Sequence, residues 1–299
     1  MITISHVTKV NVMDKNNPAV SKCKSGDTIV FEVLDCFANQ IRSEEQGKSG
    51  IDWDNINPAT GPLYIEEAKV GDILKVEILD IEIGDQGVMT DGPGSGVMGD
   101  YIKEGIAKIL KIENGKIFFN DKLSFDIDPM IGVIGVAPEG EGISTGTPGA
   151  HGSNMDCKKI RKGATVYLPV FVDGASLSMG DLHAKMGDGE VGVCGVEVDG
   201  KITVRVSVIK NWNLPTPFIV DNTHAMTVCS EENIEDALNG AVLMMYNFLM
   251  NELHMGDHEA EMLLSVTGDL SICQVVDPEK TARMEIPLSV TDAYGYKFK

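Results

Sequence analysis

The segment Ile73 to Ile83 reads I-L-K-V-E-I-L-D-I-E-I and alternates apolar with polar side chains along most of its length. Successive side chains of a β-strand point to opposite faces of the sheet, so this pattern predicts a strand with one buried face. The segment Lys201 to Ile209, K-I-T-V-R-V-S-V-I, shows the same alternation and is rich in β-branched residues, which favour strands. We therefore expect a chain built mainly from β-sheets.

Three more segments carry the same signal, with glycine, proline, Asn or Asp residues between them. They are Thr28 to Leu34, Lys116 to Phe119 and Thr165 to Val172. The chain has 32 glycines and shows no regular alternation of strands with long helices. A β-sandwich or barrel is therefore favoured over a doubly wound parallel sheet.

A helix is predicted near the C-terminus. Apolar residues recur there every three or four positions, which is the spacing of one face of an α-helix. Ser230 is expected to cap this helix, with Glu231 and Glu232 in its first turn. Asp257 is expected to cap a second helix that runs to Leu264. The apolar positions of the first helix are Ile234, Ala237, Leu238, Ala241, Val242, Met245, Phe248, Leu249 and Leu253.

The composition is that of an acidic globular protein. Of the 299 residues, 43% are hydrophobic, and 45 Asp and Glu outweigh 25 Lys and Arg to give a net charge of -20. A surface of this sign repels phosphate groups, so nucleic acids and anionic membranes are not expected as partners. No apolar stretch reaches the roughly 18 residues of a membrane helix, and no signal-peptide pattern is present. The protein is expected in the cytoplasm.

The densest cluster of polar side chains is G-D-L-H-A-K-M-G-D-G-E, residues 180–190. Asp181 and His183 are two positions apart, so on a strand both side chains project from the same face and could bind one metal ion. Asp188 and Glu190 repeat that spacing after a glycine, and a carboxylate beside a metal centre is a usual general base. The alternative is a polar turn between two strands, because D-x-H pairs often occur by accident.

A second polar cluster, H-G-S-N-M-D at residues 151–156, follows glycines and a proline and is predicted to form a loop. His151 and Asp156 are candidate metal ligands, and Asn154 could donate a hydrogen bond to a carbonyl oxygen. Asp35, at the end of an expected strand, is a third candidate. A plain Asx-rich turn at residues 151–156 and a turn-capping role for Asp35 are the open alternatives.

One glycine-rich motif is not expected to bind a dinucleotide. The segment Gly94 to Gly99, G-S-G-V-M-G, matches the dinucleotide-binding pattern, but no long helix follows it and no βαβ unit surrounds it. A glycine-rich turn is favoured there. The chain also lacks the H-E-x-x-H and P-loop motifs, so the enzyme classes that use them are not expected.

Six blocks of sequence form a wider pattern. They are Gly61 to Val76, Ile131 to Pro138 (I-G-V-I-G-V-A-P), Thr147 to Asp156 (T-P-G-A-H-G-S-N-M-D), Tyr167 to Val170 (Y-L-P-V), Gly174 to Glu190 and Leu263 to Pro278. In this order and spacing they resemble the acetamidase/formamidase family over nearly the whole chain. Two positions depart from the family pattern: Ser153 replaces a glycine of the usual H-G-G-N-M-D loop, and Met186 stands where many members have glutamine. Both changes bear on substrate choice.

The resemblance implies hydrolysis of a short aliphatic amide, of the formamide or acetamide type, to a carboxylate and ammonia. It implies a mainly β fold, a jelly-roll-like β-sandwich with smaller α+β elements and C-terminal helices, in a homodimer or larger homo-oligomer. Residues 1–299 would form one unit, divisible into an N-terminal β part (about 1–130) and a part with the metal site and the C-terminal α+β elements (about 131–299).

The resemblance also implies a divalent metal. Histidine with carboxylates suits Zn²⁺ best, and a carboxylate-only subsite nearby would suit Ca²⁺. Two alternatives stay open: a non-catalytic binding module stabilised by the same metal cluster, and an amidase that uses Cys157 as its nucleophile. The implied metal ligands are Asp35, Asp156, Asp181 and His183; Glu190 is the implied general base, and His151 and Asn154 occupy further catalytic positions.

Overall fold

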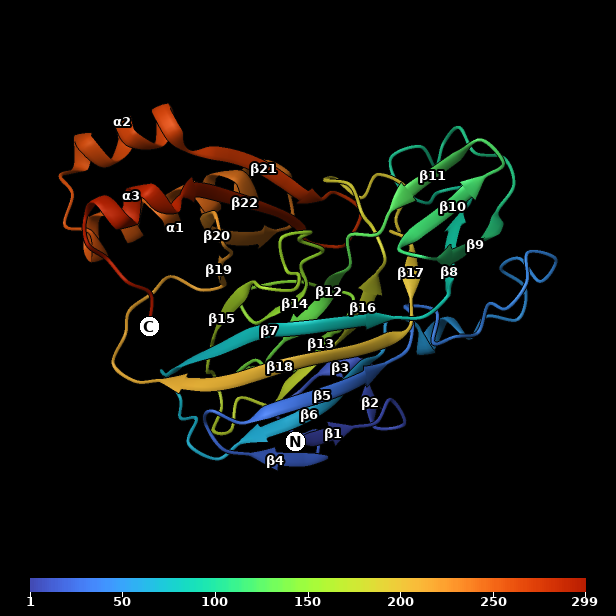
Figure 1. The fold of residues 1–299 in the computed structure, drawn as a ribbon, viewed down its shortest axis with the longest axis horizontal. Coiled ribbons are helices and arrows are strands. Elements are labelled where there is room, and N and C mark those ends of the chain that lie inside the picture. Colours follow the sequence, from blue (N-terminus) through green and yellow to red (C-terminus); the bar gives the residue numbers. More distant parts are fainter.

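Two large β-sheets are the main elements of the computed structural model, which describes residues 1–299 (Figure 1). The nine-stranded sheet has the order β1 (Ile2–Ile4), β5 (Thr28–Val33), β18 (Gly200–Ile209), β7 (Ile73–Ile83), β15 (Thr165–Pro169), β19 (Phe218–Val220), β20 (His224–Glu231), β22 (Lys280–Pro287) and β21 (Asp269–Gln274).

The second sheet has 11 strands. Its main path is β11 (Leu123–Asp126), β10 (Lys116–Asn120), β9 (Ile106–Glu113), β8 (Gln86–Asp91), β17 (Glu197–Val198), β16 (Leu177–His183), β12 (Met130–Gly135) and β14 (Gly152–Asn154). Beside this path, β6 (Ala59–Ile65) pairs with β16, β2 (Lys9–Val10) and β4 (Ser21–Cys23). A separate pair is formed by β3 (Val12–Met13) and β13 (Ile143–Ser144).

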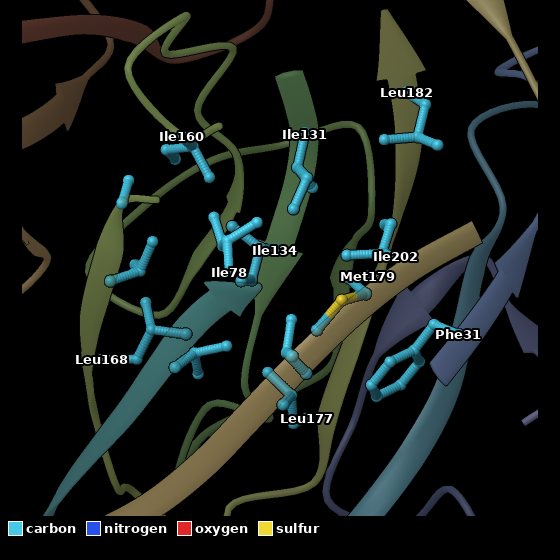
Figure 2. Packing of buried hydrophobic residues seen from close by; sticks show 14 of the residues in the cluster. Phe31, Ile78, Ile131, Ile134, Ile160, Leu168, Leu177, Met179, Leu182 and Ile202 are labelled. Atoms are coloured by element: carbon cyan, nitrogen blue, oxygen red, sulfur yellow. The ribbon is translucent and has the colours of Figure 1, made fainter. Parts of the chain in front are cut away.

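The two sheets pack against each other through one core of 38 buried residues. Phe31, Ile78 and Ile202 enter it from the nine-stranded sheet, and Met179 and Leu182 enter it from β16 of the other sheet (Figure 2). Each such buried side chain contributes roughly 1.5–3 kcal/mol relative to an exposed one. This packing fixes β16, whose last three residues include Asp181 and His183.

The strands predicted from alternation are confirmed. The alternation of β7 changes phase at Leu79, and the register against β18 shifts at the same place. Val204 pairs with Ile78, whereas the preceding residue, Thr203, pairs with Asp80, so Leu79 has no partner on β18. The phase change in the sequence therefore marks a β-bulge.

Three helices lie at the C-terminal end of the chain (Figure 1). The long helix α1 (Ile234–Glu252) packs on β20 and β22, and α2 (Asp257–Thr267) packs on α1 and β22. A second core of 16 buried residues joins these elements. The short helix α3 (Leu288–Ala293) has too few residues to show a helical period in the sequence. None of the helices has the length and apolar character needed to cross a membrane.

The two predicted helix caps are wrong. Ser230 lies in β20, because this strand stays paired with β22 through Glu231. Asn233 caps α1 instead, and its side-chain oxygen accepts a hydrogen bond from the backbone N–H of Asp236. The cap of α2 is Gly256, which leaves Asp257 as the first residue of the helix.

The mainly β class with C-terminal helices is confirmed, and the jelly-roll connectivity stays a prediction. Both sheets combine strands from before and after residue 130; for example, β7 lies between β18 and β15. The two parts expected on either side of that residue therefore share their sheets. The glycine-rich segment Gly94 to Gly99 lies in the connection between β8 and β9, as a turn and not at the start of a long helix.

Candidate active site

A cavity of about 620 Å³ lies beside the last residues of β16 and the first residues of β17. Only six of its 20 lining residues are hydrophobic, so the cavity suits a polar ligand. The ionisable side chains on its wall are Cys36, Lys48, Asp54, Asp181, His183, Glu190, Glu197 and Asp277.

Strand β16 carries two of the predicted ligands to this cavity. Asp181 and His183 both line it, as their two-residue spacing predicts. The Nε2 atom of His183 lies 3.4 Å from Oδ1 of Asp181 and 3.2 Å from Oε1 of Glu197. Because Glu197 is the register partner of His183 on β17, the sheet fixes these three side chains relative to one another.

Asp156 approaches the same imidazole from the segment after β14. Its Oδ1 atom lies 3.8 Å from Nε2 of His183, and its backbone φ is 42°, a value that few residues other than glycine adopt. Gly132 on β12 provides the space for this approach. A Cβ atom at Gly132 would lie 2.3 Å from an oxygen of Asp181 and 2.4 Å from an oxygen of Asp156.

Glu190 completes a group of three. One potential ligand atom each from Asp156, His183 and Glu190 lies within 4.8 Å of the others. The loop that carries Glu190 is held by β21: the N–H of Gly189 donates to the carbonyl of Cys273 at 2.8 Å. The predicted grouping of Asp156, His183 and Glu190 is therefore present in the structure.

Asp188 does not line the cavity, although its spacing from Glu190 repeats that of the Asp-x-His pair. Its carboxylate lies 2.7 Å from the guanidinium of Arg283 and 2.8 Å from Nζ of Lys158. Asp188 therefore neutralises a buried arginine, and only Glu190 of the D-G-E segment is available for chemistry.

Burial controls the ionisation of the group. It raises the pKa of Asp156 and of Glu190 well above the ordinary carboxyl range, and it raises the pKa of Glu197 to about 7. Burial alone would lower the pKa of His183, but the carboxylates of Glu197 and Asp181 raise it above its ordinary value. Together with Asp181 and Glu197, the group contains more carboxylates than one imidazolium can balance. Protons or a cation must supply the remaining positive charge.

This donor set fits a divalent metal ion. Both carboxylate oxygens of Asp156, Oδ1 of Asp181 and Oε2 of Glu197 are buried and have no hydrogen-bond partner. Leaving buried polar atoms unpaired is costly, so these oxygens are suited to a ligand that accepts their lone pairs. Carboxylates combined with an imidazole are typical of zinc and similar ions.

Two predicted site residues do not join the group. The Oδ1 atom of Asp35 accepts a hydrogen bond of 2.7 Å from the backbone N–H of Asn39, so this buried carboxylate caps a turn. His151 is also buried and does not line the cavity. Burial lowers the pKa of His151 to about 4, which keeps its imidazole neutral at pH 7.

Asn154 lines the cavity but is arranged differently from the prediction. Its Nδ2 donates a hydrogen bond of 2.7 Å to Oδ2 of Asp277, while its Oδ1 is buried without a partner. The unpaired atom of Asn154 is thus an acceptor, where the sequence suggested a donor to a carbonyl oxygen. It suits a ligand that carries an N–H group.

The two departures from the family pattern lie outside the cavity wall. Ser153 has a φ of 72°, which explains why glycine is common at this position, and its hydroxyl donates to the carbonyl of Thr145 at 2.9 Å. Met186 is buried and does not line the cavity, so the expected apolar change of the pocket wall is not present there.

Cys157 does not have the position that a nucleophile needs. It is fully buried, absent from the cavity wall, and lies beside Cys273. The hydrogen bond with Cys273 lowers the pKa of Cys157, and the nearby guanidinium of Arg283 acts in the same direction. A substrate in the cavity would not meet this thiol.

Five ionisable residues of the cavity wall were not predicted: Cys36, Lys48, Asp54, Glu197 and Asp277. Glu197 could have been found only from the register of β17 against β16, which the sequence does not give. Asp277 lies in the block Leu263 to Pro278, which resembles the family but carries no ligand residues at the two-residue spacing of the Asp-x-His pair that would single it out. Cys36 directly follows Asp35, so the prediction chose the neighbouring residue.

The sequence and the fold of this chain both match those of known proteins. The acetamidase/formamidase family pattern matches residues 5–142 and 139–293. The chain belongs to the acetamidase/formamidase family. A crystal structure of an acetamidase from Bacillus halodurans is 47% identical, covers 99% of this chain and 100% of its own, and superposes with a TM-score of 0.97.

Other members of the family show the same relationship at different distances. A predicted acetamidase/formamidase from Thermoanaerobacter tengcongensis is 45% identical, covers 99% of each chain and superposes with a TM-score of 0.97. A formamidase from Methylophilus methylotrophus is 26% identical, and the match covers 65% of this chain. The match spans only 62% of the length of that formamidase.

Proposed function

We propose that this acetamidase/formamidase family member hydrolyses a short linear amide to a carboxylate and ammonia, with a divalent, zinc-like ion as cofactor. Family membership and relatives named acetamidase and formamidase support amide hydrolysis. The observation that carries the proposal is the buried group of Asp156, His183 and Glu190 beside a polar cavity.

The ligand set follows from the unpaired atoms. Asp156, Asp181 and His183 would hold the ion, since their donor atoms converge from β16 and from the segment after β14. When bound, a divalent ion supplies a Lewis acid that polarises a carbonyl oxygen and makes water easier to deprotonate. It would also balance the negative charge that burial makes costly.

Glu190 is placed to move protons. Its carboxyl group lies on the cavity wall and belongs to the same group as the proposed ligands. As a carboxylate it can take a proton from the attacking water and return it to the departing nitrogen. A general base or acid of this kind contributes a factor of about 10² to 10⁴ in rate.

Asn154 is placed to orient the substrate. Its unpaired Oδ1 can accept a hydrogen bond from the amide N–H₂ group, and its hydrogen bond to Asp277 holds the side chain in that orientation. This contact would favour a primary amide over an ester of the same size, since an ester has no N–H to donate.

The geometry favours catalysis over a structural metal site. A structural site is closed by protein ligands, whereas a catalytic site keeps a position open to the substrate. Asp181, His183 and Glu190 all line the cavity, so a small molecule can reach them. The alternative in which Cys157 is the nucleophile lacks this access.

Ammonia release from formamide, acetamide and propionamide tests the proposal. We expect release from at least one of the three amides, at a rate about 10² to 10⁴ lower in the Glu190→Gln variant. A folded, metal-loaded protein that binds amides but releases no ammonia from any of them would indicate the binding module instead.

We also propose a homodimer or larger homo-oligomer in the cytoplasm. Leu243, Met262 and Val266 are exposed apolar residues of α1 and α2 that a second copy could cover. All six cysteines are free thiols, as the reducing cytoplasm favours. Light scattering that reports a particle of 32.2 kDa at micromolar concentration would contradict the oligomer.

A further inference from the structure

The cavity wall carries a second group of ligand atoms beside the one already described. The Sγ atom of Cys36 and one carboxylate oxygen each of Asp181 and Glu197 lie within 4.8 Å of one another. All three residues line the cavity, and of these only Asp181 is shared with the ligand set of Asp156, Asp181 and His183 proposed for the first ion. The two groups meet at His183, whose Nε2 lies 3.4 Å from Asp181 and 3.2 Å from Glu197.

The carboxylates of this second group lack the partners that buried oxygens normally have. The side chains of Asp181 and Glu197 are 4% and 1% exposed, and each keeps one buried oxygen without a hydrogen-bond partner. Nε2 of His183 can donate only one hydrogen bond, so it cannot satisfy the carboxylates of both Asp181 and Glu197. A cation would satisfy the remaining oxygens.

Cys36 is held toward these carboxylates by its own turn. Asp35 and Asn39 close this turn on each other: the N–H of Asn39 donates to Asp35 at 2.7 Å, and Oδ1 of Asn39 accepts from the N–H of Asp35 at 3.1 Å. The Nδ2 atom of Asn39 donates to Asp199 at 3.0 Å, next to β17. The buried Asp35 thus positions the thiol that follows it.

We propose that Cys36, Asp181 and Glu197 form a second cation subsite, selective for a thiophilic divalent ion such as Zn²⁺, Co²⁺ or Cd²⁺. Binding replaces the S–H bond of Cys36 with a sulfur–metal bond and releases the proton to water. This second subsite adds to the proposed metal-dependent hydrolysis. It rests on the proposed function only for the presence of a first ion at Asp156, Asp181 and His183.

The chemistry of the group decides between this role and two others. A free Cys36 thiolate acting as a nucleophile would face two carboxylates with no cation to offset their repulsion. A calcium ion requires six to eight oxygen ligands, whereas this group offers two carboxylates and a sulfur. A thiolate with carboxylates suits the softer ions, and metal ions about 3.5–4 Å apart are common in hydrolases.

Titration of the chelator-treated protein with Co²⁺ tests the subsite without any amide present. We expect about two equivalents of bound cobalt per chain and a thiolate-to-cobalt charge-transfer band in the near ultraviolet. The Cys36→Ser variant should lose that band and about one equivalent of cobalt. Cys229→Ser is the matched control, because Cys229 is also half-buried but lies on β20 against α1, and it should keep both.

A second measurement uses the unaltered protein, in case Cys36→Ser fails to fold. Alkylation by iodoacetamide, followed by mass spectrometry, should modify Cys36 at least tenfold more slowly when Zn²⁺ is present, with no change at Cys229. No charge-transfer band in the wild type, a band that persists in Cys36→Ser, or equal alkylation with and without Zn²⁺ would each overturn the subsite. Because none of these readouts involves amide hydrolysis, a failure of the proposed function would be seen separately.

Discussion

The imidazole of His183 lies 3.2 Å from the carboxylate of Glu197, its register partner on the adjacent strand. This pair joins the two groups of ligand atoms at the cavity, since His183 belongs to one group and Glu197 to the other. Both side chains are 1% exposed, so their charges are poorly screened by water. Removing one partner should therefore change metal binding and stability together.

Glu190→Gln should separate chemistry from binding. The amide keeps the size and hydrogen bonding of the carboxylate but cannot accept a proton, so kcat should fall by about 10² to 10⁴ while metal content and Tm stay near wild type. Steady-state kinetics with the best amide and elemental analysis measure both quantities. Asp188→Asn is the control, because Asp188 contacts Arg283 and Lys158 and does not line the cavity. This variant should lower Tm and leave kcat near the wild-type value.

His183→Ala should fail in a different way. Loss of a residue that only hydrogen-bonds to a metal ligand costs about 10- to 100-fold in metal affinity, so loss of the ligand itself should cost more than about 100-fold. Bound metal also stabilises the folded state, by about 2.7 kcal/mol at 100 times Kd, so Tm should fall as well. If Glu190→Gln loses its metal while His183→Ala keeps both metal and activity, the two assignments are wrong.

Gly132→Ala tests the convergence of the two aspartates. The new methyl group would lie 2.3 Å from Asp181 and 2.4 Å from Asp156, so both carboxylates must move. We expect a loss of metal affinity of at least about tenfold, comparable to the loss of a supporting contact. Gly140→Ala is the control, because nothing lies within 4 Å of a Cβ at that position. Wild-type metal affinity in Gly132→Ala would show that the two carboxylates do not act together.

His151 should make the protein sensitive to acid. Burial holds its folded pKa at about 4, below the ordinary value of 6.5, so the unfolded chain binds a proton first as the pH falls. Its contribution to stability is complete above pH 6.5 and is lost as the pH falls toward 4, by about 1.4 kcal/mol per pKa unit and so on the order of 2–3 kcal/mol.

Urea unfolding of His151→Gln between pH 4 and pH 7 measures this effect. The free energy of unfolding should depend less steeply on pH in this variant than in the wild type. His258→Gln, at an exposed position of α2, should keep the wild-type slope. An unchanged slope in His151→Gln would show that His151 does not set the acid sensitivity.

Local pattern predicted five of the 22 strands and the long helix, because burial of one face imposes a period on the sequence. Asp181, His183 and Glu190 could be chosen in the same way, since they lie close together in the chain and Asp181 and His183 share the face of one strand. Glu197 and Cys36 could not, because their proximity to His183 depends on which strands pair and how a turn is closed. The wrong cap at Ser230 has the same origin, since pairing with β22 extends β20 over the expected cap.

Metal content and ammonia release, measured in the same protein samples, show directly whether the reaction depends on a metal ion. We expect at least one tightly bound zinc-like ion per chain. A chelator should remove the ion and the ammonia release in parallel, and added Zn²⁺ should restore both. A metal-free sample that releases ammonia at the full rate would contradict metal-dependent hydrolysis, because the group of Asp156, His183 and Glu190 would then have no metal-dependent role in the reaction.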